Sequence, residues 1–426
     1  MPSETLELPF HASKAHGSAS GLKLAIELEA FCEFGNPTRR ITTPFSAGQS
    51  NPAVATFVNE FWTSKQRAAS RLHEISYRAC FKPQLPRFFI ERLTQSGDVV
   101  YDPFMGRGTT PVEAALLGRV PYGSDINPLS AVLTQPRLNP PTLEQIVERL
   151  AKIDFDSADE SPEDLLVFYH PETLREIASL KKYLLTRRKE NLLDSIDDWI
   201  CMVALNRLTG HSAGFFSVYT LPPNQAVSVK SQRKINEQRQ QTPPRRNIRD
   251  IILKKSRILL SDCSFTTRDV LARVSPQSKL LTSPASATIE IPDNSVSLVV
   301  TSPPFLDVVD YAGDNWLRCW FLGIDPKTVK LTVPGKLEHW QAAMTQVFHE
   351  LHRILKPGGH IAFEVGEVRG GKVKLEETVL TCGTAANLHP VLVLINDQKF
   401  TKTANCWGVQ NNFKGTNTNR IVLFRK

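Results

Sequence analysis

The stretch that decides the fold is residues 98–125, which read DVVYDPFMGRGTTPVEAALLGRVPYGSD. Residues 98–102 predict a short buried strand, and residues 120–124 predict a second strand that ends at Asp125. Between them, a Gly-rich turn leads into a predicted helix at residues 111–117, where Pro111 suits the first helical turn. A strand, a helix and a second strand in this order indicate a βαβ unit, and therefore a parallel sheet.

The same alternation of strands and helices returns after residue 289. The patterns predict a buried strand at 297–301, an amphipathic helix at 340–355, a strand at 360–365 and closing strands at 391–395 and 421–425. The sequence Lys356-Pro357-Gly358-Gly359 predicts the end of that helix. Two such blocks indicate an α/β fold with one doubly wound sheet and helices on both faces.

The remaining residues are arranged around these two blocks. Residues 1–50 are predicted to be an N-terminal extension, irregular up to about residue 45 except for a periodic piece at 22–31. From residue 52 to residue 93 the pattern is helical and is broken at two prolines. We expect residues 51–136 and 281–426 to form the two parts of the α/β domain, and residues 137–280 to be a helical, basic insertion.

The positive charge of the chain is concentrated in that insertion. The 426 residues carry a formal net charge of +8. Ten Lys or Arg residues lie between 230 and 257, opposed only by Glu237 and Asp250, so this segment alone accounts for an excess of +8. Such a segment is either a solvated helix face or an element that contacts phosphates. The second interpretation predicts that DNA is bound by Arg233, Lys234, Arg245, Arg246, Arg249, Lys254 and Lys255.

Cysteine spacing and hydropathy indicate the compartment in which the protein is expected to work. Seven cysteines are scattered along the chain without a CxxC pair, so the sequence predicts no metal site of the zinc-ribbon kind and fits a reducing compartment. No signal peptide is visible, and no apolar stretch approaches the ~20 residues that a membrane span needs. We therefore expect a cytoplasmic, nucleoid-associated prokaryotic protein that has no membrane partner.

The Gly-rich turn indicates the kind of ligand that the first block binds. Gly106 and Gly108 allow the backbone to approach a ligand closely, and Asp102 can accept hydrogen bonds from a cationic or amine-bearing group. Asp125, roughly 20 residues beyond the glycines, can accept both hydroxyls of a ribose. The turn lacks the third glycine of a dinucleotide motif, and its carboxylates would repel a phosphate. A positively charged nucleoside without phosphates fits, which describes S-adenosylmethionine; the alternative is a purely structural turn.

A second motif, Ser302-Pro303-Pro304-Phe305, follows the buried strand of the second block. Two consecutive prolines fix the backbone and hold the preceding carbonyl rigidly, and such carbonyls can accept the protons of an exocyclic amine. Ser302 adds a hydroxyl, and Phe305 offers a flat face on which a flipped base can stack. The alternative interpretation is a rigid turn that merely ends the strand.

Methyl transfer to such an amine needs little beyond these groups. Holding the amine in line with a sulfonium methyl supplies proximity and orientation, and nearby acceptors stabilise the developing positive nitrogen. Attack at a ring carbon would instead need a thiolate, commonly in a Pro-Cys context. None of the seven cysteines follows a proline. The motif therefore favours amine methylation without a covalent enzyme intermediate.

Together the two motifs resemble those of the amino-methylating DNA methyltransferases, which modify cytosine N4 or adenine N6. That family has a Gly-rich turn DPFxGxGT and a catalytic loop [DNS]PP[YFW], and Ser at the first loop position is associated with the N4-cytosine enzymes. The resemblance spans roughly residues 60–135 and 285–426, including Lys82-Pro83-Gln84-Leu85-Pro86 before the turn. It implies a Rossmann-like S-adenosylmethionine-dependent methyltransferase sheet whose insertion recognises the DNA target.

The same resemblance implies roles for individual residues. It places the methionine end of the cofactor near Lys82 and the ribose on Asp125, and it makes residues 302–305 the catalytic loop. The implied cofactor-binding residues are Lys82, Asp102, Pro103, Phe104, Gly106, Gly108, Thr109 and Asp125; the catalytic ones are Ser302, Pro303, Pro304 and Phe305. Where the family usually has an acidic residue that contacts the adenine, this chain has Pro284-Ala285-Ser286, so no residue is assigned to that contact.

The function that the resemblance implies is site-specific methylation of cytosine N4 in duplex DNA by base flipping, with S-adenosylmethionine and no metal. A cognate restriction endonuclease acting separately is the implied partner. Three alternatives stay open: an N6-adenine DNA methyltransferase, an RNA base amino-methyltransferase, and a methyltransferase-like fold that only binds DNA. Among lesser candidates, Glu364 and Glu367 favour a structural or loop-positioning role, while Asn206-Arg207 favours helix capping over DNA contact.

Overall fold

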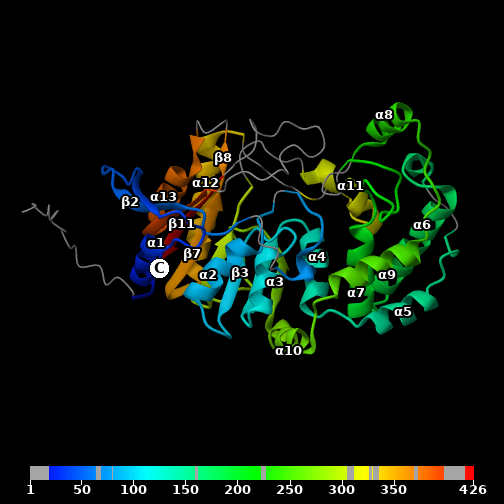
Figure 1. The fold of residues 1–426 in the computed structure, drawn as a ribbon, viewed down its shortest axis with the longest axis horizontal. Coiled ribbons are helices and arrows are strands. Elements are labelled where there is room, and N and C mark those ends of the chain that lie inside the picture. Colours follow the sequence, from blue (N-terminus) through cyan, green and yellow to red (C-terminus); the bar gives the residue numbers. More distant parts are fainter. Residues whose placement is uncertain are drawn as a thin grey trace, which may run out of the picture.

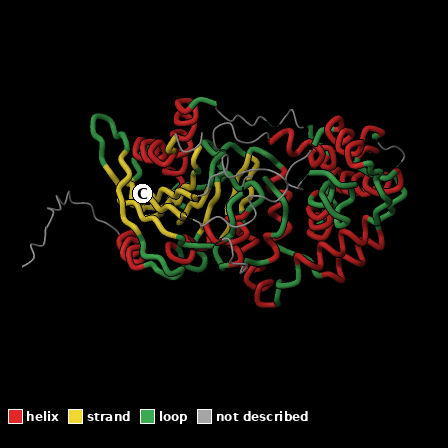
Figure 2. The backbone as a smooth tube through the Cα atoms, turned by 45° about the horizontal axis from the view of Figure 1, so that its top comes forward, coloured by secondary structure: helices red, strands yellow, loops and turns green. Residues whose placement is uncertain are grey.

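The computed structural model describes residues 19–63, 69–78, 80–158, 162–221, 227–304, 311–325, 329, 335–368, 373–397 and 418–426. Within these residues, a nine-stranded sheet lies on the side of the molecule that holds the C-terminus, and a group of helices lies on the other side (Figures 1 and 2). None of the helices in these ranges is both long and apolar enough to cross a membrane.

The strand order in the sheet is β1-β2-β10-β11-β7-β6-β3-β4-β5. Strands β7, β6, β3, β4 and β5 run parallel, whereas β11 is antiparallel to both of its neighbours. The strands are β1 (Arg39–Pro44), β2 (Ala53–Asn59), β3 (Val99–Asp102), β4 (Val120–Asp125), β5 (Lys279–Thr282), β6 (Val296–Thr301), β7 (Leu355–Val365), β10 (His389–Asp397) and β11 (Thr418–Arg425). A separate two-stranded ribbon pairs β8 (Glu367–Val368) with β9 (Val373–Lys374).

Helices cover both faces of the sheet because its strands are apolar on both sides. On one face, α12 (Leu337–Ile354) and α13 (Leu375–Ala385) pack against side chains that include Val299 and Phe363. On the other, α1 (Ala19–Ala30), α2 (Gln84–Leu93) and α3 (Thr109–Leu116) pack against side chains that include Leu298 and Val300. Neighbouring residues of β6 thus enter opposite layers, as the two-residue period of a strand requires. These features confirm the predicted doubly wound α/β fold.

The chain between β4 and β5 is helical, as expected for the insertion. It holds α4 (Leu129–Leu138), α5 (Leu143–Lys152), α6 (Pro171–Lys189), α7 (Ser195–Leu205), α8 (Val229–Arg239), α9 (Ile248–Leu259) and α10 (Phe265–Val274), with short 3-10 turns at Glu163–Val167 and Ser275–Gln277. We call α5 to α9 (residues 143–259) the helical lobe (Figure 1). The predicted domain boundaries themselves stay a prediction.

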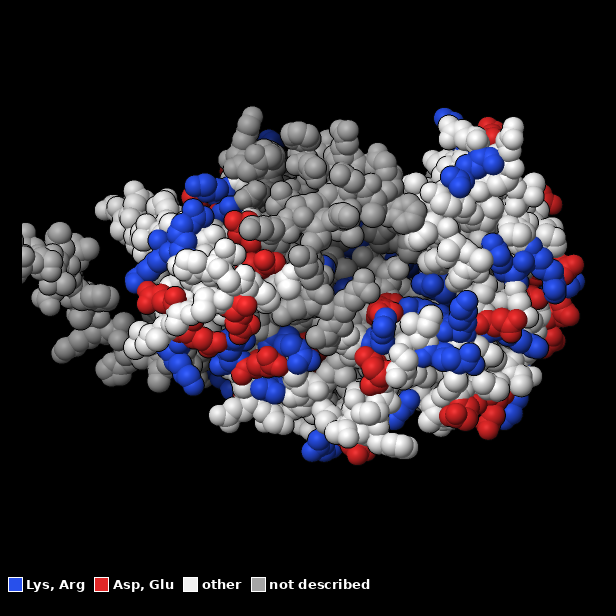
Figure 3. Space-filling view, in the orientation of Figure 1, with Lys and Arg blue, Asp and Glu red and all other residues white. Residues whose placement is uncertain are grey.

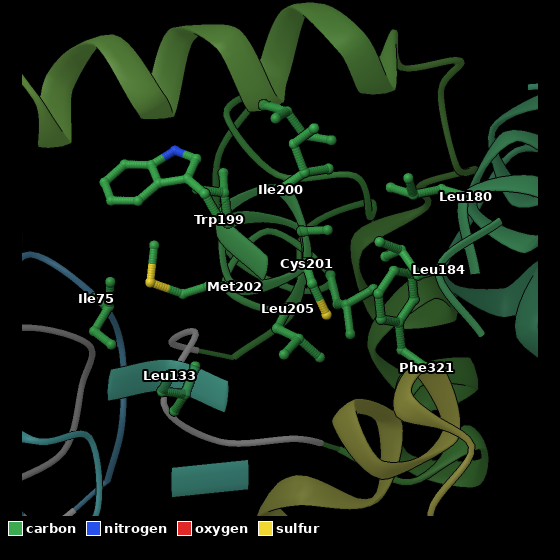
Figure 4. Packing of buried hydrophobic residues seen from close by; sticks show 14 of the residues in the cluster. Ile75, Leu133, Leu180, Leu184, Trp199, Ile200, Cys201, Met202, Leu205 and Phe321 are labelled. Carbon is green, nitrogen blue, oxygen red and sulfur yellow. The ribbon is translucent and has the colours of Figure 1, made fainter. Parts of the chain in front are cut away.

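The helical lobe is built around α7. Its buried residues Trp199 to Leu205 contact Leu180 and Leu184 of α6 on one side and Leu133 of α4 on the other, and α11 (Tyr311–Leu322) adds Phe321 (Figure 4). This core also includes Ile75, from the segment that follows the 3-10 turn Arg71–His73. One apolar core therefore contains residues of the helical lobe and residues of the segment that precedes α2 and β3.

Two local predictions were wrong, both because pairing between strands overrode the local pattern. Residues 53–59 are not helical but form β2, which pairs in parallel with β10 more than 330 residues later. Among residues 19–50, α1 corresponds to the predicted periodic piece at 22–31, but Arg39–Pro44, expected to be irregular, form β1, which pairs with β2. The helix predicted at 340–355 does end as expected, at Ile354, and β7 begins at Leu355.

Candidate active site

The Gly-rich turn leaves β3 and is held closed by β4. Gly106 has φ 50° and Gly108 has φ 75°, backbone conformations that favour glycine. The backbone N–H of Gly106 donates to Oδ2 of Asp125 over 2.9 Å, which ties the turn to the end of β4. A Cβ at Gly108 would lie 2.2 Å from Oγ1 of Thr134, so this glycine also permits the close approach of α4. The turn's shape thus depends on both glycines and on Asp125.

Asp102 ends β3 as a buried carboxyl, 1% exposed. Its Oδ1 accepts from the N–H of Phe104 over 3.0 Å and from the hydroxyl of Thr301 over 2.6 Å. Its Oδ2 is buried and has no hydrogen-bond partner within the described residues. Burial, with a smaller contribution from the nearby charge of Asp125, raises the pKa of Asp102 to about 7. The contact with Thr301 joins the ends of β3 and β6 directly.

Asp125 ends β4 and is half-buried. Its Oδ1 accepts from the N–H of Asn127 over 2.9 Å, while Oδ2 accepts from Gly106. Burial raises the pKa of Asp125, and those two backbone bonds partly offset that shift. Asn127 in turn accepts the N–H of Leu129 at the start of α4. Each carboxylate oxygen of Asp125 still has a lone pair that can accept from a ligand hydroxyl.

The Ser-Pro-Pro-Phe motif follows the end of β6 and is anchored by two other elements. The indole Nε1–H of Trp340, on α12, donates to the carbonyl of Pro304 over 2.9 Å. Ser302 is a neighbour of the carboxyl of Glu364 at the end of β7 and contributes to its electrostatics. Oε1 of Glu364 also accepts from the side chain of Asn419 on β11 over 3.0 Å. Burial raises the pKa of Glu364, and Asn419 and Ser302 oppose that rise.

These strand ends border one pocket of about 390 Å³. The Gly-rich turn and the end of β4 contribute one wall, the residues after β5 and β6 contribute the next, and α12 closes it. Its lining residues are Tyr77, Pro103, Phe104, Gly106, Asp125, Ile126, Asn127, Pro284, Ala285, Ser286, Ser302, Pro304, Ala343, Met344, Gln346 and Val347. Two motifs that lie almost 200 residues apart in the sequence therefore meet at one edge of the sheet.

Some of the predicted cofactor and catalytic residues line this pocket, and others do not. Pro103, Phe104, Gly106, Asp125, Ser302 and Pro304 line it. Asp102, Gly108, Thr109, Pro303 and Lys82 are not among its lining residues, and Phe305 lies outside the described residues. Lys82 is exposed just before α2, and partial burial lowers its pKa. Asp102 and Gly108 nevertheless shape the turn, through the contacts described above.

Three functional candidates had no motif of their own in the sequence. Tyr77 and Met344 line the pocket, and Trp340 anchors the loop. Asn419 holds Glu364, for which the sequence had favoured a loop-positioning role. Trp340 and Met344 carry only the helical period of an amphipathic helix, which predicts burial but no specific contact.

The predicted DNA-binding residues lie in the helical lobe, and Figure 3 shows Lys and Arg gathered over α7 and α9. Arg233 and Lys234 are exposed on α8. Arg245 forms ion pairs with Glu172 and Glu176, and Arg249 donates to the carbonyl of Ile153. Arg246, just before α9, makes a backbone hydrogen bond to Thr173, while Lys254 and Lys255 border a small cleft on α9. The segment is therefore not one uniform basic surface.

Comparison with known proteins relates part of this site to a family. Residues 41–132, which include the Gly-rich turn and Asp125, match the family model of DNA methylases. The match covers the first block of the α/β sheet, from β1 into α4.

Proteins similar in sequence to this chain include Type II methyltransferases. M.BsoBI of Geobacillus stearothermophilus is 24% identical over 281 residues, which are 60% of this chain and 53% of the relative. M.MjaII of Methanocaldococcus jannaschii is 30% identical over 135 residues, which are 30% of this chain and 25% of the relative. The match thus spans about half of the first relative and a quarter of the second.

Among solved structures, a TehB-like SAM-dependent methyltransferase from Corynebacterium glutamicum aligns with 82% of this chain and 90% of its own. The two are 8% identical, with a TM-score of 0.29. At that score the likeness carries no argument about function, which must come from the site itself.

Proposed function

We propose that the chain is a site-specific DNA methyltransferase that transfers a methyl group from S-adenosylmethionine to the exocyclic N4 of cytosine in duplex DNA. The single observation that carries this proposal is that Gly106 and Asp125 line the same pocket as Ser302 and Pro304. By similarity to the Type II relatives, we also propose that it modifies DNA alongside a separate cognate endonuclease.

The residues around the Gly-rich turn fit a sulfonium nucleoside. Two carboxyls, Asp102 and Asp125, end adjacent strands, and the buried Oδ2 of Asp102 has no partner within the described residues. Such a site favours a cation and disfavours phosphates. Asp125 would accept the ribose hydroxyls, and Ile126, Ala285 and Val347 would contact the base. When bound, S-adenosylmethionine supplies an electrophilic methyl group on a positively charged sulfur.

The loop after β6 supplies acceptors for the target amine. Because the carbonyl of Pro304 already accepts from Trp340, the carbonyl and hydroxyl of Ser302 remain as the acceptors near the pocket. A Ser302 hydroxyl that donated its proton to the neighbouring carboxyl of Glu364 would keep its lone pairs available to an amine proton. Two acceptors on a rigid loop would orient the amine lone pair toward the methyl group. Ser302, rather than Asp, at this position supports cytosine over adenine.

Nucleoside mass spectrometry tests the proposal. The chain is incubated with isotope-labelled S-adenosylmethionine and mixed-sequence duplex DNA, and the DNA is digested to nucleosides. We expect labelled N4-methylcytosine. Label only in N6-methyladenine would contradict the cytosine assignment, and label in RNA but not in DNA would contradict the DNA assignment. The same DNA, sequenced by a method that resolves the modified base, identifies the recognition site.

Recognition of the target is assigned to the helical lobe. A base can be methylated at an exocyclic amine only outside the stacked duplex, so the proposal requires base flipping. The predicted contacts of Arg233, Lys234, Arg246, Lys254 and Lys255 with DNA phosphates stay part of the proposal. Phosphate contacts would position the duplex over the pocket without reading its sequence.

A further inference from the structure

A second cleft, of about 150 Å³, lies between the end of α7 and the middle of α9. Three of its lining side chains are cationic: Arg207, Lys254 and Lys255. The other lining residues are Ala213, Gly214, Asp250, Ile251 and Ile258, so Asp250 brings the only carboxylate among the residues that border it. We call the three cations the α9 cation cluster.

The three cations of this cluster border one small cleft, and no ion pair within the described residues neutralises their charges. None of the three forms an ion pair within the part of the chain that the structure describes. Burial, together with the charge of Arg207, lowers the pKa of Lys255 to about 8. Glu74 opposes this shift and Arg71 adds to it, and those two residues are paired with each other. Like charges that are partly desolvated in this way are stabilised by a bound anion.

Arg207 is held in place by neutral partners. Its Nε donates to the carbonyl of Asn206 over 2.7 Å, and its guanidinium lies 4.0 Å from the ring centroid of Phe215. Burial, with the charge of Arg318, lowers the pKa of Arg207 to about 10, so it stays charged at neutral pH. A fixed, charged guanidinium whose terminal N–H groups have no hydrogen-bond partner within the described residues is suited to an oxyanion.

Two neighbouring basic residues of the same segment, Arg245 and Arg249, instead make contacts within the protein. Arg245 is paired with Glu172 and lies 3.5 Å from Oε1 of Glu176. Arg249 donates to the carbonyl of Ile153 over 3.0 Å and stacks on Phe155 at 4.6 Å. These contacts hold the start of α9 against α5 and α6. Sequence alone had treated all of these cations as equivalent.

The cation cluster is also tied to the active site. Oδ1 of Asn206, the residue before Arg207, accepts from the N–H of Ser76 over 2.7 Å. The next residue, Tyr77, lines the cofactor pocket, and a Cβ on Gly106 would lie 3.3 Å from its ring. An anion bound at the cluster would therefore have a fixed position relative to the pocket.

We propose that Arg207, Lys254 and Lys255 form a binding site for one phosphate group of the DNA backbone. The inference rests on the proposed function, because it takes duplex DNA as the substrate. The cluster sets the register of the duplex relative to the active site, whereas Arg245 and Arg249 stabilise the lobe. Asp250 at the edge of the cleft limits the site to a single phosphodiester.

The test compares two double variants that each remove two positive charges. Binding of a mixed-sequence duplex of about 30 base pairs is measured by fluorescence anisotropy between about 50 and 200 mM NaCl. For K254Q/K255Q we expect affinity at the lowest salt to fall at least tenfold, and the slope of log affinity against log salt to become shallower by about 1, as expected for the loss of one phosphate contact. For the control R245Q/R249Q we expect an unchanged slope and a lower Tm.

The outcomes separate this site from the proposed function. A slope that K254Q/K255Q leaves unchanged, or that both double variants reduce equally, would overturn the phosphate site even if the wild-type chain methylates DNA. A wild-type chain that transfers no methyl group but shows the expected difference between the variants would overturn the proposed function and support the phosphate site. Circular dichroism of each variant establishes that a lost slope is not a lost fold.

Discussion

The two sides of the active-site pocket differ in how far apart in the sequence their contacts lie. On the cofactor side, Asp102 bonds to Phe104 two residues later, and Gly106 bonds to Asp125 nineteen residues later. On the amine side, Pro304 is held by Trp340, 36 residues away, and Glu364 is held by Asn419, 55 residues away. Both sides carry a readable motif, but the distant residues that support the Ser-Pro-Pro-Phe loop, such as Trp340, lie outside it.

The difference also predicts a division of labour. The cofactor side consists of carboxyls and backbone N–H groups fixed within one βαβ unit, so changes there should act mainly on cofactor affinity. The amine side consists of a rigid loop supported by three other elements, so changes there should act mainly on the rate of transfer. A variant on the cofactor side that changed mainly the rate of transfer would contradict this comparison. So would a variant on the amine side that changed mainly cofactor affinity.

The largest effect is expected for Pro303→Ala. Losing the rigid Pro-Pro backbone misplaces the acceptors for the amine, so we expect kcat to fall about 10²- to 10³-fold. Cofactor Kd, measured by calorimetry, should stay within a few-fold of the wild type. The matched control is Pro292→Ala, which changes an exposed proline that does not line the pocket. An equal loss in kcat and in cofactor affinity would contradict the division.

Asp125→Ala should act mainly on cofactor affinity. The carboxylate holds Gly106 and Asn127 and is the proposed ribose acceptor, so its loss removes charge-assisted hydrogen bonds worth about 1.5–3 kcal/mol. We expect cofactor Kd to rise about 10- to 100-fold, with a smaller change in kcat at saturating cofactor. Asp269→Asn, an exposed carboxyl on α10, serves as the control. Unchanged cofactor affinity would argue against the ribose assignment.

Trp340→Phe tests whether a distant residue controls the loop. The ring remains to fill the core, but the buried carbonyl of Pro304 loses its donor, at a cost of about 1–3 kcal/mol. We expect kcat to fall about 10- to 30-fold while cofactor Kd changes less than twofold. A loss of Tm with unchanged kcat would mean that Trp340 only stabilises the fold.

The smallest effect is expected from pH. Burial raises the pKa of Asp102 from 3.8 to about 7, so the folded chain binds more protons than the unfolded chain between those values. The contribution of Asp102 to the free energy of unfolding therefore falls as the pH rises from about 4 to about 7. A cationic cofactor favours the ionised carboxylate, so its affinity should rise, by no more than about tenfold, from pH 6 to pH 8.

Asp102→Asn is the control for this pH dependence, because the amide oxygen can still accept from Phe104 and Thr301 but does not titrate. The affinity of this variant should vary less with pH than that of the wild type. If the two proteins show the same pH profile between pH 6 and pH 8, Asp102 is not the group that links the cofactor to protons.

Sequence by itself determined the parts of this protein whose physics is local. The βαβ unit at residues 98–125, the turn with Gly106 and Gly108, and the strand before Ser302 follow from periodicity and from residues with special backbone geometry. The match to the DNA methylase family model includes this βαβ unit, since residues 41–132 contain the turn.

Tertiary structure alone decided what depends on partners far along the chain. Residues 53–59 become a strand because β10 pairs with them, and Trp340 supports the loop because α12 packs across the end of β6. Charge alone could not separate Arg245, which is paired with Glu172, from Lys255, which has no ion pair among the described residues. The physical reason is the same in each case: a side chain's environment is set by neighbours that folding brings together, and a pattern within one segment does not contain them.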